Sequence, residues 1–387
     1  MSLTPVVALR DVAIIQRDSI QPIAIQANTP YVGLENIQPG GDLVGVRGAQ
    51  PGELASSKFV FTPKHLLYGK LRPYLAKVAR PDFEGICSTD ILPVLPGPSL
   101  DRSYLAHFLL RPESVAWAAS RATGANLPRL SPRALAEMAV PLPSLPEQRR
   151  IAEVLDRADA LRAKRRAALA QLDTLAQSIF LDMFGDPVTN PRRWPLARFG
   201  SLCDRVTVGV VVKPASYYVS SGVPALRSLN VKPGKVVLDD LVYFSKQIND
   251  TTLRKSKLRA GDLVLVRSGQ PGTAAVVPPE LDGVNAIDLL IATPSRERTD
   301  AAFLCAFFGS SGGQNLVLAS QRGQIQKHLN AGSLNRAPVP VPPLRLQKEF
   351  ARRIASVDDQ TATSERSLAN LNRLFASLQQ RAFSGQL

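Results

Sequence analysis

Two long stretches of the chain carry apolar residues at intervals of three and four positions. Such spacing places apolar side chains along one face of an α-helix. A polar turn interrupts the first stretch, and Thr361 and Ser364 interrupt the second. We therefore predict two long helices, over residues 146–185 and 344–387. The apolar positions are Ile151, Leu155, Ala158, Leu161, Ala168, Leu172, Leu175 and Ile179 in the first stretch, and Phe350, Ile354, Val357, Leu368, Leu371, Phe375 and Leu378 in the second.

Shorter apolar runs lie before and between the two long stretches. Runs of four to eight apolar residues that end in turn residues are typical of strands, and longer runs with helical spacing are typical of helices. Both kinds occur in each segment, which predicts α/β domains. The expected strands cover 66–71, 85–94, 262–266 and 282–292, and the expected helices cover 102–119 and 299–310.

The chain contains an internal repeat. Asn36, Pro39 and Gly40 recur as Asn230, Pro233 and Gly234, and Pro73, Gly85 and Asp90 recur as Pro271, Gly283 and Asp288. A proline-rich exit with Pro141, Pro143, Leu145 and Gln148 recurs as Pro340, Pro342, Leu344 and Gln347. Proline can end a strand and open a helix, so each exit leads into a long helix. The predicted order is domain 1–145, helix 146–185, domain 186–343 and helix 344–387.

The repeat predicts how the long helices are used. Each apolar face must be buried, and antiparallel pairing of the two helices would form a coiled coil with one α/β domain at each end. A helix of about 35 residues is roughly 50 Å long, which would place two reading surfaces a turn or more of B-DNA apart. The target would then be asymmetric, with two different half-sites around an unread gap. The alternative is a coiled coil that serves only oligomerisation, but that role needs no second domain.

The charge of the chain indicates an acidic partner. There are 47 Lys and Arg against 32 Asp and Glu, which gives a net charge of +15 and a pI near 10.1. Nucleic acid is the favoured partner, because neutralising its phosphates releases counterions. A membrane surface is less favoured, because no run of 18 apolar residues occurs. The N-terminal residues lack an export signal, so we expect a cytoplasmic protein.

Candidate DNA-contacting residues are polar and basic side chains in loops between the apolar strands. Arg can bind guanine in a bidentate manner, and Asn or Gln can do so with adenine. For each residue taken singly, solvent exposure or a phosphate contact is an alternative, and the repeated Asn36 and Asn230 are also suited to capping a turn. The candidates are Lys70, Arg72, Tyr74, Lys77, Asn126 and Arg129 in the first domain, and Arg227, Asn230, Arg267, Ser268, Gln270, Gln324, Gln326, Lys327 and His328 in the second.

Signatures of catalysis are not found in the sequence. The three cysteines show no CxxC spacing, and the three histidines show no metal-ligand spacing, so we expect no metal site. There is no phosphate-binding GxxxxGK loop. NPRRW from Asn190 and PDFEG from Pro81 only partly match methyltransferase and nuclease motifs. We therefore expect a non-catalytic protein without a cofactor of its own.

The two exits and the helices that follow them resemble the specificity subunits of type I restriction-modification systems. The carrying segments are PLPSLPEQRRIAEVLD from Pro141, PVPPLRLQKEFARRI from Pro340 and the ending LFASLQQRAFSGQL. The resemblance implies two target-recognition domains, two spacer helices and no catalytic residues. It also implies docking of two methyltransferase subunits that use S-adenosylmethionine, and a separate restriction subunit that translocates DNA with ATP and Mg²⁺. Leu346 replaces the Glu147 of the first exit, which bears on how symmetrically partners dock.

The sequence is also compatible with two other functions. One is a stand-alone DNA-binding regulator with two reading domains, and the other is the recognition half of a divided methyltransferase-nuclease. A methyltransferase gene beside this one would favour the subunit, and an isolated gene would favour the regulator.

Overall fold

The computed structural model describes residues 4–50, 52–319 and 328–387. The chain divides into two compact units, which we describe separately. The first unit comprises Met1–Arg166 with Ser367–Leu387, and the second comprises Ala167–Arg366. Each long helix therefore contributes one part to each unit.

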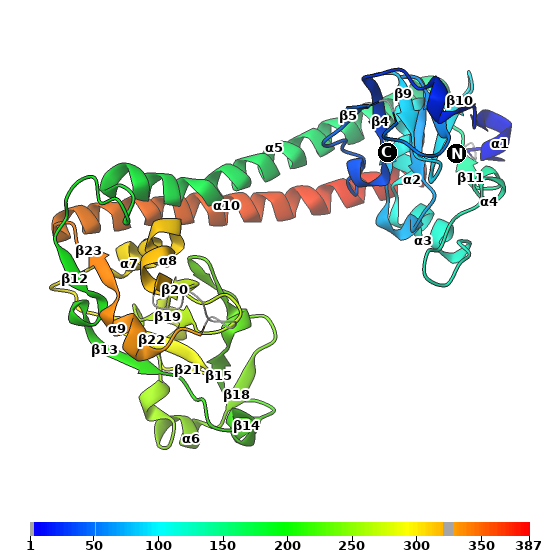
Figure 1. Ribbon diagram of the computed structural model, residues 1–387. Coiled ribbons are helices and arrows are strands. Elements are labelled where there is room, and N and C mark those ends of the chain that lie inside the picture. Colours follow the sequence, from blue (N-terminus) through cyan, green and yellow to red (C-terminus); the bar gives the residue numbers. More distant parts are fainter. Residues whose placement is uncertain (1–3, 51, 320–327) are drawn as a thin grey trace. The chain divides into compact units, whose positions relative to one another are not determined.

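The two long helices are α5 (Leu145–Phe184) and α10 (Leu344–Phe383). In the first unit, Arg162 Nε of α5 donates to Asn372 Oδ1 of α10 over 2.8 Å. In the second unit, the rings of Phe180 in α5 and Phe350 in α10 have centroids 5.9 Å apart. The start of each helix thus pairs with the end of the other, so the helices run antiparallel (Figure 1). The predicted pairing of the helices is confirmed.

Two of the apolar positions predicted to lie between the long helices do not lie there. Leu161 is 53% exposed and Leu175 is 38% exposed, whereas Ile151 and Leu155 are buried. Arg162 takes the inward position beside Leu161, and its guanidinium lies 4.2 Å from the centre of the Phe375 ring. The expectation for Leu161 and Leu175 was wrong, because a helix turns by 3.6 residues and its contact face drifts relative to a fixed spacing.

The described residues of the first unit form three sheets. A four-stranded sheet has the order β2 (Ala13–Ile15), β10 (Ile91–Pro96), β7 (Leu66–Gly69) and β8 (Val78–Ala79). A five-stranded sheet has the order β3 (Ser19–Ile20), β6 (Lys58–Phe61), β9 (Gly85–Cys87), β4 (Thr29–Val32) and β5 (Arg47–Ala49). Strands β1 (Val6–Ala8) and β11 (Ala139–Pro141) form a pair. The helices are α1 (Leu9–Val12), α2 (Arg102–Leu109), α3 (Pro112–Ser120) and α4 (Pro132–Ala136).

The second unit repeats this plan. A four-stranded sheet has the order β13 (Cys203–Val208), β22 (Leu289–Pro294), β19 (Leu263–Val266) and β20 (Ala274–Val276). A second one has the order β14 (Tyr218–Val219), β18 (Val242–Phe244), β15 (Val223–Leu226) and β21 (Asn285–Ala286). The pairs are β12 (Leu196–Arg198) with β23 (Pro338–Pro340), and β16 (Val231–Lys232) with β17 (Lys235–Val236). The helices are α6 (Lys246–Asp250), α7 (Ala301–Gly309), α8 (Ser311–Leu318) and α9 (Ala331–Arg336).

The sheet β2-β10-β7-β8 of the first unit and the sheet β13-β22-β19-β20 of the second have equivalent strands in the same order. Strands β4 and β9 pair in parallel in the first unit, as β15 and β21 do in the second, while the other paired strands are antiparallel. The predicted α/β domains and the internal repeat are therefore confirmed. The fold class is two similar α/β domains with two long antiparallel helices.

Two expected elements are each divided in the structure. The strand expected over 85–94 is two strands, β9 and β10, in different sheets, and the chain changes sheets at Ser88–Asp90. The helix expected over 102–119 is α2 followed by α3, and Pro112 lies at the first position of α3. Proline lacks an amide hydrogen and is well tolerated at a helix start, which explains the break.

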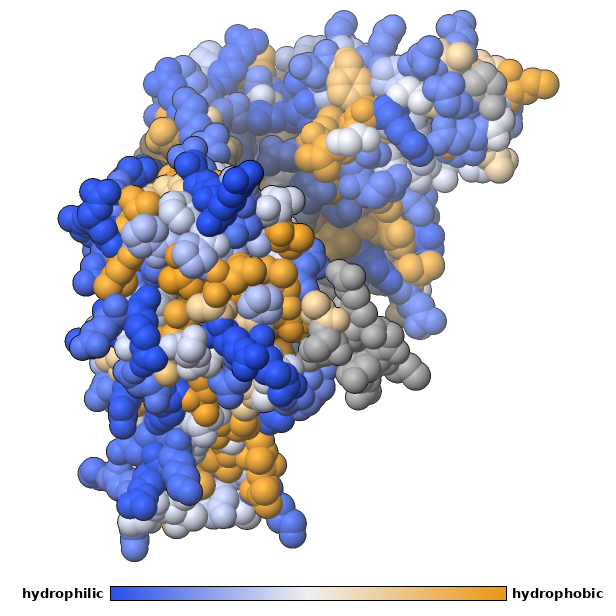
Figure 2. Space-filling model, turned by 60° about the vertical axis from the view of Figure 1, so that its left-hand side comes forward, coloured by the Kyte–Doolittle hydropathy of each residue, from blue (hydrophilic) through white to orange (hydrophobic). Residues whose placement is uncertain are grey.

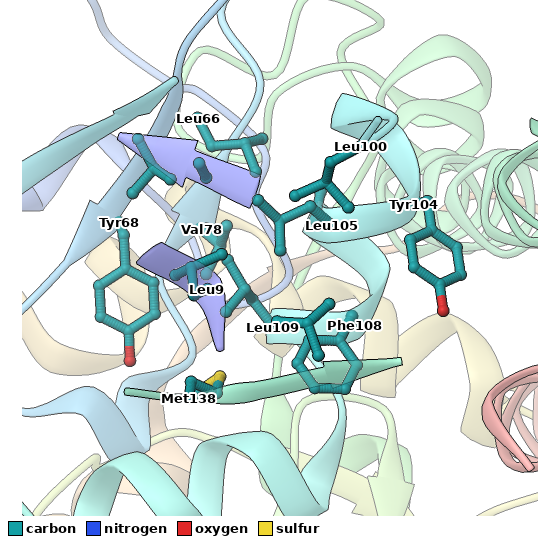
Figure 3. Close-up of a cluster of buried hydrophobic side chains, with 14 of the residues drawn as sticks. Leu9, Leu66, Tyr68, Val78, Leu100, Tyr104, Leu105, Phe108, Leu109 and Met138 are labelled. Atoms are coloured by element: carbon teal, nitrogen blue, oxygen red, sulfur yellow. The ribbon is translucent and has the colours of Figure 1, made fainter. Parts of the chain in front are cut away.

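The hydrophobic core of each unit includes parts of both long helices. In the first unit, residues of α2 pack with the sheet, and Figure 3 shows Leu105 and Leu109 beside Leu66 and Val78. Ile151 of α5 and Ala382 of α10 are buried in the same cluster. In the second unit, rings from α5, α7 and α10 pack together; these are Phe180, Phe184, Phe303 and Phe350. Burying one such side chain is worth about 1.5–3 kcal/mol, so the domains hold the helices firmly.

Candidate nucleic-acid interface

An aspartate lies where the chain changes sheets in each unit. Asp90 lies between β9 and β10, and Asp288 lies between β21 and β22. Asp288 has a φ of 49°, a left-handed conformation that aspartate tolerates better than most residues. The sequence repeat paired these residues, but they were not among the candidate site residues.

In the first unit, Asp90 holds two of the candidate residues. Arg129 binds it with two hydrogen bonds, Nε to Oδ1 at 2.9 Å and Nη2 to Oδ2 at 3.3 Å. Lys70 Nζ lies 3.9 Å from Oδ1, and the Lys70 amide donates to the Asp90 carbonyl over 2.9 Å. The hydrogen bond from Arg129 to Asp90 raises the pKa of the guanidinium, which therefore stays charged. We call Lys70, Asp90 and Arg129 the Asp90 cluster.

In the second unit, Asp288 holds a matching group. Arg267 Nη1 donates to Asp288 Oδ1 over 2.6 Å. Nη2 of Arg267 contacts His328 Nε2 at 2.8 Å, and Ser268 Oγ contacts His328 Nδ1 at 2.8 Å. Arginine can only donate, so Nε2 accepts, and a neutral His328 then carries its proton on Nδ1 and donates to Ser268. We call Arg267, Ser268, Asp288 and His328 the Asp288 cluster.

The backbone shows that the two clusters are equivalent. Lys70 directly follows β7, and Arg267 directly follows β19. The Lys70 carbonyl accepts a hydrogen bond from the Leu130 amide, and the Arg267 carbonyl accepts one from the Leu329 amide, both at 2.9 Å. Arg129 and His328 precede these two leucines. The same fold position thus carries different side chains in the two units.

The loop over residues 70–77 begins at Lys70 of the Asp90 cluster. Arg72 and Ala76 have φ angles of 51° and 50°, and they flank the 3-10 helix η3 (Pro73–Leu75). Arg72 is exposed and Tyr74 is 54% exposed, so both side chains are available to a partner. Lys77 is half-buried, and its Nζ donates to the Leu34 carbonyl over 2.6 Å. Lys77 therefore helps to hold the conformation of the loop, and little of its side chain is available to a partner.

A tight hairpin lies against this loop. Thr123 and Arg129 exchange both backbone hydrogen bonds, at 3.0 and 2.9 Å, and Gly124 has a φ of 116°. The Arg72 amide donates to the Pro128 carbonyl over 2.7 Å, which ties the hairpin to the loop. Asn126 lies exposed at the hairpin tip. The first unit thus brings all six of its candidate residues to neighbouring loops.

The second unit has a shorter loop at the equivalent place. Gly269 and Gly272 have φ angles of 83° and 89° and let the chain turn between β19 and β20. Ser268 and Gln270 are exposed on this turn. The candidates Gln324, Gln326 and Lys327 lie outside the described residues. Those that the structure brings together are Arg267, Ser268, Gln270 and His328.

Asn230 has a structural position, which corrects the expectation that it contacts DNA. Its side chain is fully buried. Oδ1 accepts from the Arg227 amide at 2.9 Å, and Nδ2 donates to the carbonyls of Val237 and Asp239 at 3.1 and 2.7 Å. Asn36 makes the same pattern of bonds in the first unit, with the Gly33 amide and two carbonyls. No polar atom of Asn230 is left for a base, so capping explains the repeat.

Arg227 is positioned by that cap, apart from the Asp288 cluster. Its Nη2 donates to Asp240 Oδ2 over 2.9 Å. Among the described residues, the buried side-chain nitrogen and oxygen atoms without a hydrogen-bond partner are Nε of Arg227 and Nε of Arg267. A buried polar group without a partner costs free energy. Both atoms belong to candidate residues.

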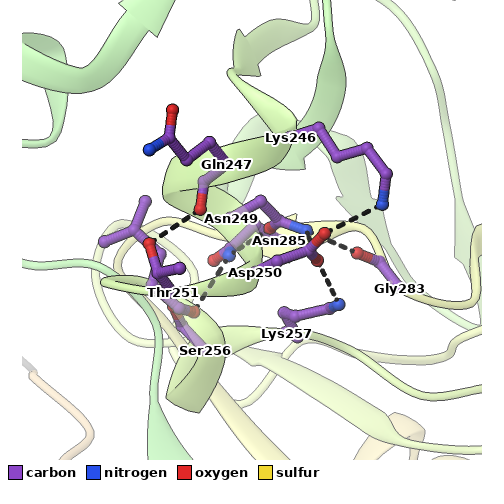
Figure 4. A network of polar contacts seen from close by, with 10 residues as sticks. Lys246, Gln247, Asn249, Asp250, Thr251, Ser256, Lys257, Gly283 and Asn285 are labelled. Carbon is purple, nitrogen blue, oxygen red and sulfur yellow. Dashed lines mark hydrogen bonds and ion pairs between the residues drawn. The ribbon is translucent and has the colours of Figure 1, made fainter.

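A polar network supports the turn that carries Asp288. The Asn285 side chain is fully buried; it donates to Asn249 Oδ1 at 2.7 Å and to the Leu253 carbonyl at 3.2 Å (Figure 4). Asn285 is in β21, three residues before Asp288, and it joins this strand to α6. Hydrogen bonds from Lys257 and Lys246 lower the pKa of Asp250 in this network to about 2. The first unit has the buried Cys87 at the position equivalent to Asn285.

The face of the molecule in Figure 2 is largely hydrophilic, and the segment around Lys70 of the Asp90 cluster is basic. Figure 2 shows hydrophilic side chains over most of the visible face, with apolar patches between them. Between Lys64 and Arg80 the sequence contains no carboxylate; its basic residues are Lys64, Lys70, Arg72, Lys77 and Arg80.

In the described part of the chain, no group of three or more His, Cys, Asp or Glu side chains is arranged to hold a metal ion. Of the described helices, none is by itself long and apolar enough to span a membrane, although the bent pair of α7 and α8 meets a test of length and composition.

Comparison with known proteins finds similarity to one family. Residues 6–171 match the type I restriction modification DNA specificity domain. The specificity subunit of the type I restriction enzyme EcoDI from Escherichia coli is 33% identical over 184 residues, which are 44% of this chain and 41% of that subunit. The specificity subunit of EcoKI from Escherichia coli K12 is 24% identical over 385 residues, or 89% of this chain and 82% of that subunit.

A solved structure has a similar fold over nearly the whole chain. It was determined for the complex assembly and conformational transition of a type I restriction-modification system, and it aligns with a TM-score of 0.61 at 19% identity. The alignment covers 99% of this chain and 98% of that one. At this identity the likeness shows the fold alone. It agrees with the two α/β domains and two long helices described above.

Proposed function

We propose that the chain is a specificity subunit of a type I restriction-modification system, the family to which it is similar, and that it recognises DNA with two separate surfaces, one in each unit. The observation that carries this proposal is the pair of equivalent clusters around Asp90 and Asp288. Each holds an arginine beside exposed polar residues on loops of a rigid sheet. Because the side chains differ between the clusters, the two half-sites differ, and the target is asymmetric and bipartite.

The residues around the clusters are suited to reading bases and binding phosphates. Arg129 and Arg267 are both held by carboxylates; the Arg129 side chain is 43% exposed, whereas the Arg267 side chain is 14% exposed. Asn126 and Gln270 are exposed amides of the kind that bind adenine, and arginine is the kind that binds guanine. Exposed basic residues such as Arg72 add phosphate contacts, which give affinity without sequence preference. Specificity and affinity thus come from neighbouring residues of the same loops.

We further propose that the chain acts as a non-catalytic subunit in the cytoplasm. Two methyltransferase subunits that use S-adenosylmethionine would dock on it, and a translocating restriction subunit that uses ATP and Mg²⁺ would join them. Exposed apolar residues on the long helices support such docking: Leu161 and Leu374 in the first unit are 53% and 51% exposed. Leucines at this exposure leave apolar area that a partner can cover.

Selection of binding sites tests the proposal. The chain is co-expressed with the methyltransferase encoded beside it, and the purified complex selects DNA from a random pool at near-physiological salt. The expected result is two different short half-sites at a fixed spacing. A single contiguous palindrome would favour a stand-alone regulator, and salt-driven binding without any motif would overturn sequence recognition.

A further inference from the structure

The glutamine of each proline-rich exit is a fully buried link between a domain and its long helix. Gln148 lies in the first turns of α5 and has no exposed surface. Its Oε1 accepts from the Asp101 amide at 2.8 Å, and its Nε2 donates to the carbonyls of Ser99 and Pro143 at 3.0 and 2.8 Å. One amide thus joins the helix, the exit and the segment before α2.

Gln347 makes the equivalent link in the second unit. Its side chain is also fully buried. Oε1 accepts from the Asp300 amide at 2.9 Å and from Thr299 Oγ1 at 3.0 Å, and Nε2 donates to the Pro342 carbonyl at 2.7 Å. Asp101 and Asp300 both cap the next helix, α2 or α7, through a side-chain oxygen. The glutamine therefore connects the long helix with α2 in the first unit and with α7 in the second. We call these two links the joints.

The two joints differ in their second polar contact. In the first unit, Asp156 lies about two helical turns after Gln148. It accepts from Arg80 at 2.7 and 3.0 Å and from His107 Nε2 at 2.8 Å. At the equivalent positions the second unit has Ala355 for Asp156 and Ala306 for His107, and apolar residues such as Phe350 pack there. Asp156 and Gln148 thus both hold α5 to the first domain by polar contacts, whereas in the second unit Gln347 supplies the polar contacts beside apolar packing.

We propose that Gln148 and Gln347 are positioning residues that fix the angle between each reading domain and its long helix, and thereby the spacing of the two half-sites. This inference rests on the proposed function. The reading loops lie on the domains, and the helices extend from the joints, so an error in angle at a joint displaces a whole reading surface. A loosened joint leaves each surface intact but relaxes the distance at which both can bind one duplex.

The test measures gap selectivity, which is the preference for one spacing of the two half-sites over others. It uses the complex of the full chain with its methyltransferase partner. The DNA pool holds both half-sites separated by gaps of different lengths. Gln347→Met keeps the length of the side chain and removes its polar contacts. The expected result is a loss of about fivefold in preference for the wild-type gap over gaps one base pair longer or shorter, the size of effect that one net hydrogen bond allows. The half-site sequences stay the same.

Matched variants separate the joint from general stability. Gln148→Met changes gap preference less than Gln347→Met, because Asp156 still holds the first joint; Gln148→Met with Asp156→Ala reaches a similar loss. Gln360→Met and Gln171→Met, at exposed positions of α10 and α5, leave gap preference unchanged. Thr299→Val removes one bond to Gln347 and serves if Gln347→Met does not fold.

The outcomes are distinct. Reduced binding by Gln347→Met and Thr299→Val at every gap, with the wild-type gap still preferred to the wild-type degree, would overturn the positioning role and leave a structural one. If the wild-type complex selects no bipartite site at all, the proposed function fails before the joint is tested.

Discussion

The guanidinium of Arg129 closes a two-point ion pair on Asp90, with Nε and Nη2 on separate carboxylate oxygens. In the second unit Arg267 approaches Asp288 at the equivalent turn. A carboxylate in a basic loop lowers the affinity for phosphate, so its presence at both turns requires a benefit. We propose that the benefit is orientation, because a guanidinium held in one plane presents its free donors in a fixed direction.

Replacing Asp90 by Asn should affect the first half-site and leave the second unchanged. Asparagine keeps the shape but loses the charge and the two-point pairing with Arg129. Thermal stability should stay near wild type, because exposed ion pairs contribute little to stability. Binding to duplexes altered in one half-site at a time measures the effect. Equal loss at both half-sites would contradict a local role.

Asn230→Ala should destabilise the second unit. The side chain is fully buried, and the change removes the bonds to Val237 and Asp239 and the cap on Arg227. Loss of buried hydrogen bonds that leaves backbone groups unpaired costs about 2–3 kcal/mol. Urea unfolding of the full chain measures the free energy of unfolding. Asn126→Ala is the control, since Asn126 is exposed and its loss should leave stability unchanged.

Asp156→Asn should lower stability at neutral pH and have less effect in acid. Burial alone would raise the pKa of Asp156, but hydrogen bonds from His107 and Arg80 outweigh it and hold the pKa well below its ordinary value. A lowered folded pKa gives stability that is present above the unfolded value of about 4 and is lost as the pH falls below it. The side chain is 38% exposed, so solvent screening limits the expected loss to about 1–2 kcal/mol at pH 7.

Urea midpoints of wild type and Asp156→Asn at several pH values check this expectation. The difference between the two proteins should narrow below about pH 4. A difference that is constant from neutral to acid pH would mean that the carboxylate charge does not stabilise the fold.

Asn285→Ala should weaken reading of the second half-site. The change removes the bonds from β21 to Asn249 and to the Leu253 carbonyl, and β21 leads into the turn at Asp288. We expect reduced discrimination between second half-site sequences, with the first half-site read normally. Competition binding with single-base variants measures this. Asp250→Asn, at the exposed edge of the same network, is the milder comparison.

Much of the fold could be predicted from the sequence. The spacing of apolar residues located both long helices, and repeated residues such as Gln148 and Gln347 showed that the two halves are equivalent. The outward positions of Leu161 and Leu175 could not be predicted, because a fixed spacing does not follow the drift of a real helix. Neither could the change of sheet at Asp90, since a continuous apolar run contains no sign of which sheet each half joins.

The candidate site could be predicted only in part. Residue type and loop position found Arg129 and Arg267, which the structure places in the clusters. Residue type and loop position did not distinguish Asn230 from Asn126. Asn230 is buried and recurs in the repeat because it caps a turn, whereas Asn126 is exposed. The same two criteria also missed Asp90 and Asp288, although a repeated acidic residue beside basic loops was the available signal. Orientation by a partner depends on tertiary contacts that sequence spacing does not specify.

The most direct test replaces Asp90 and Asp288 one at a time, because each aspartate holds an arginine in one of the two clusters. The complex with Asp90→Ala and the complex with Asp288→Ala each select sites from a random DNA pool, beside the wild type. Recognition by two separate surfaces predicts that each variant loses sequence preference in one half-site, a different one in each case, while the other half-site is recovered as in wild type. Loss of both half-sites in either variant, or of neither in both, would contradict recognition by two separate surfaces.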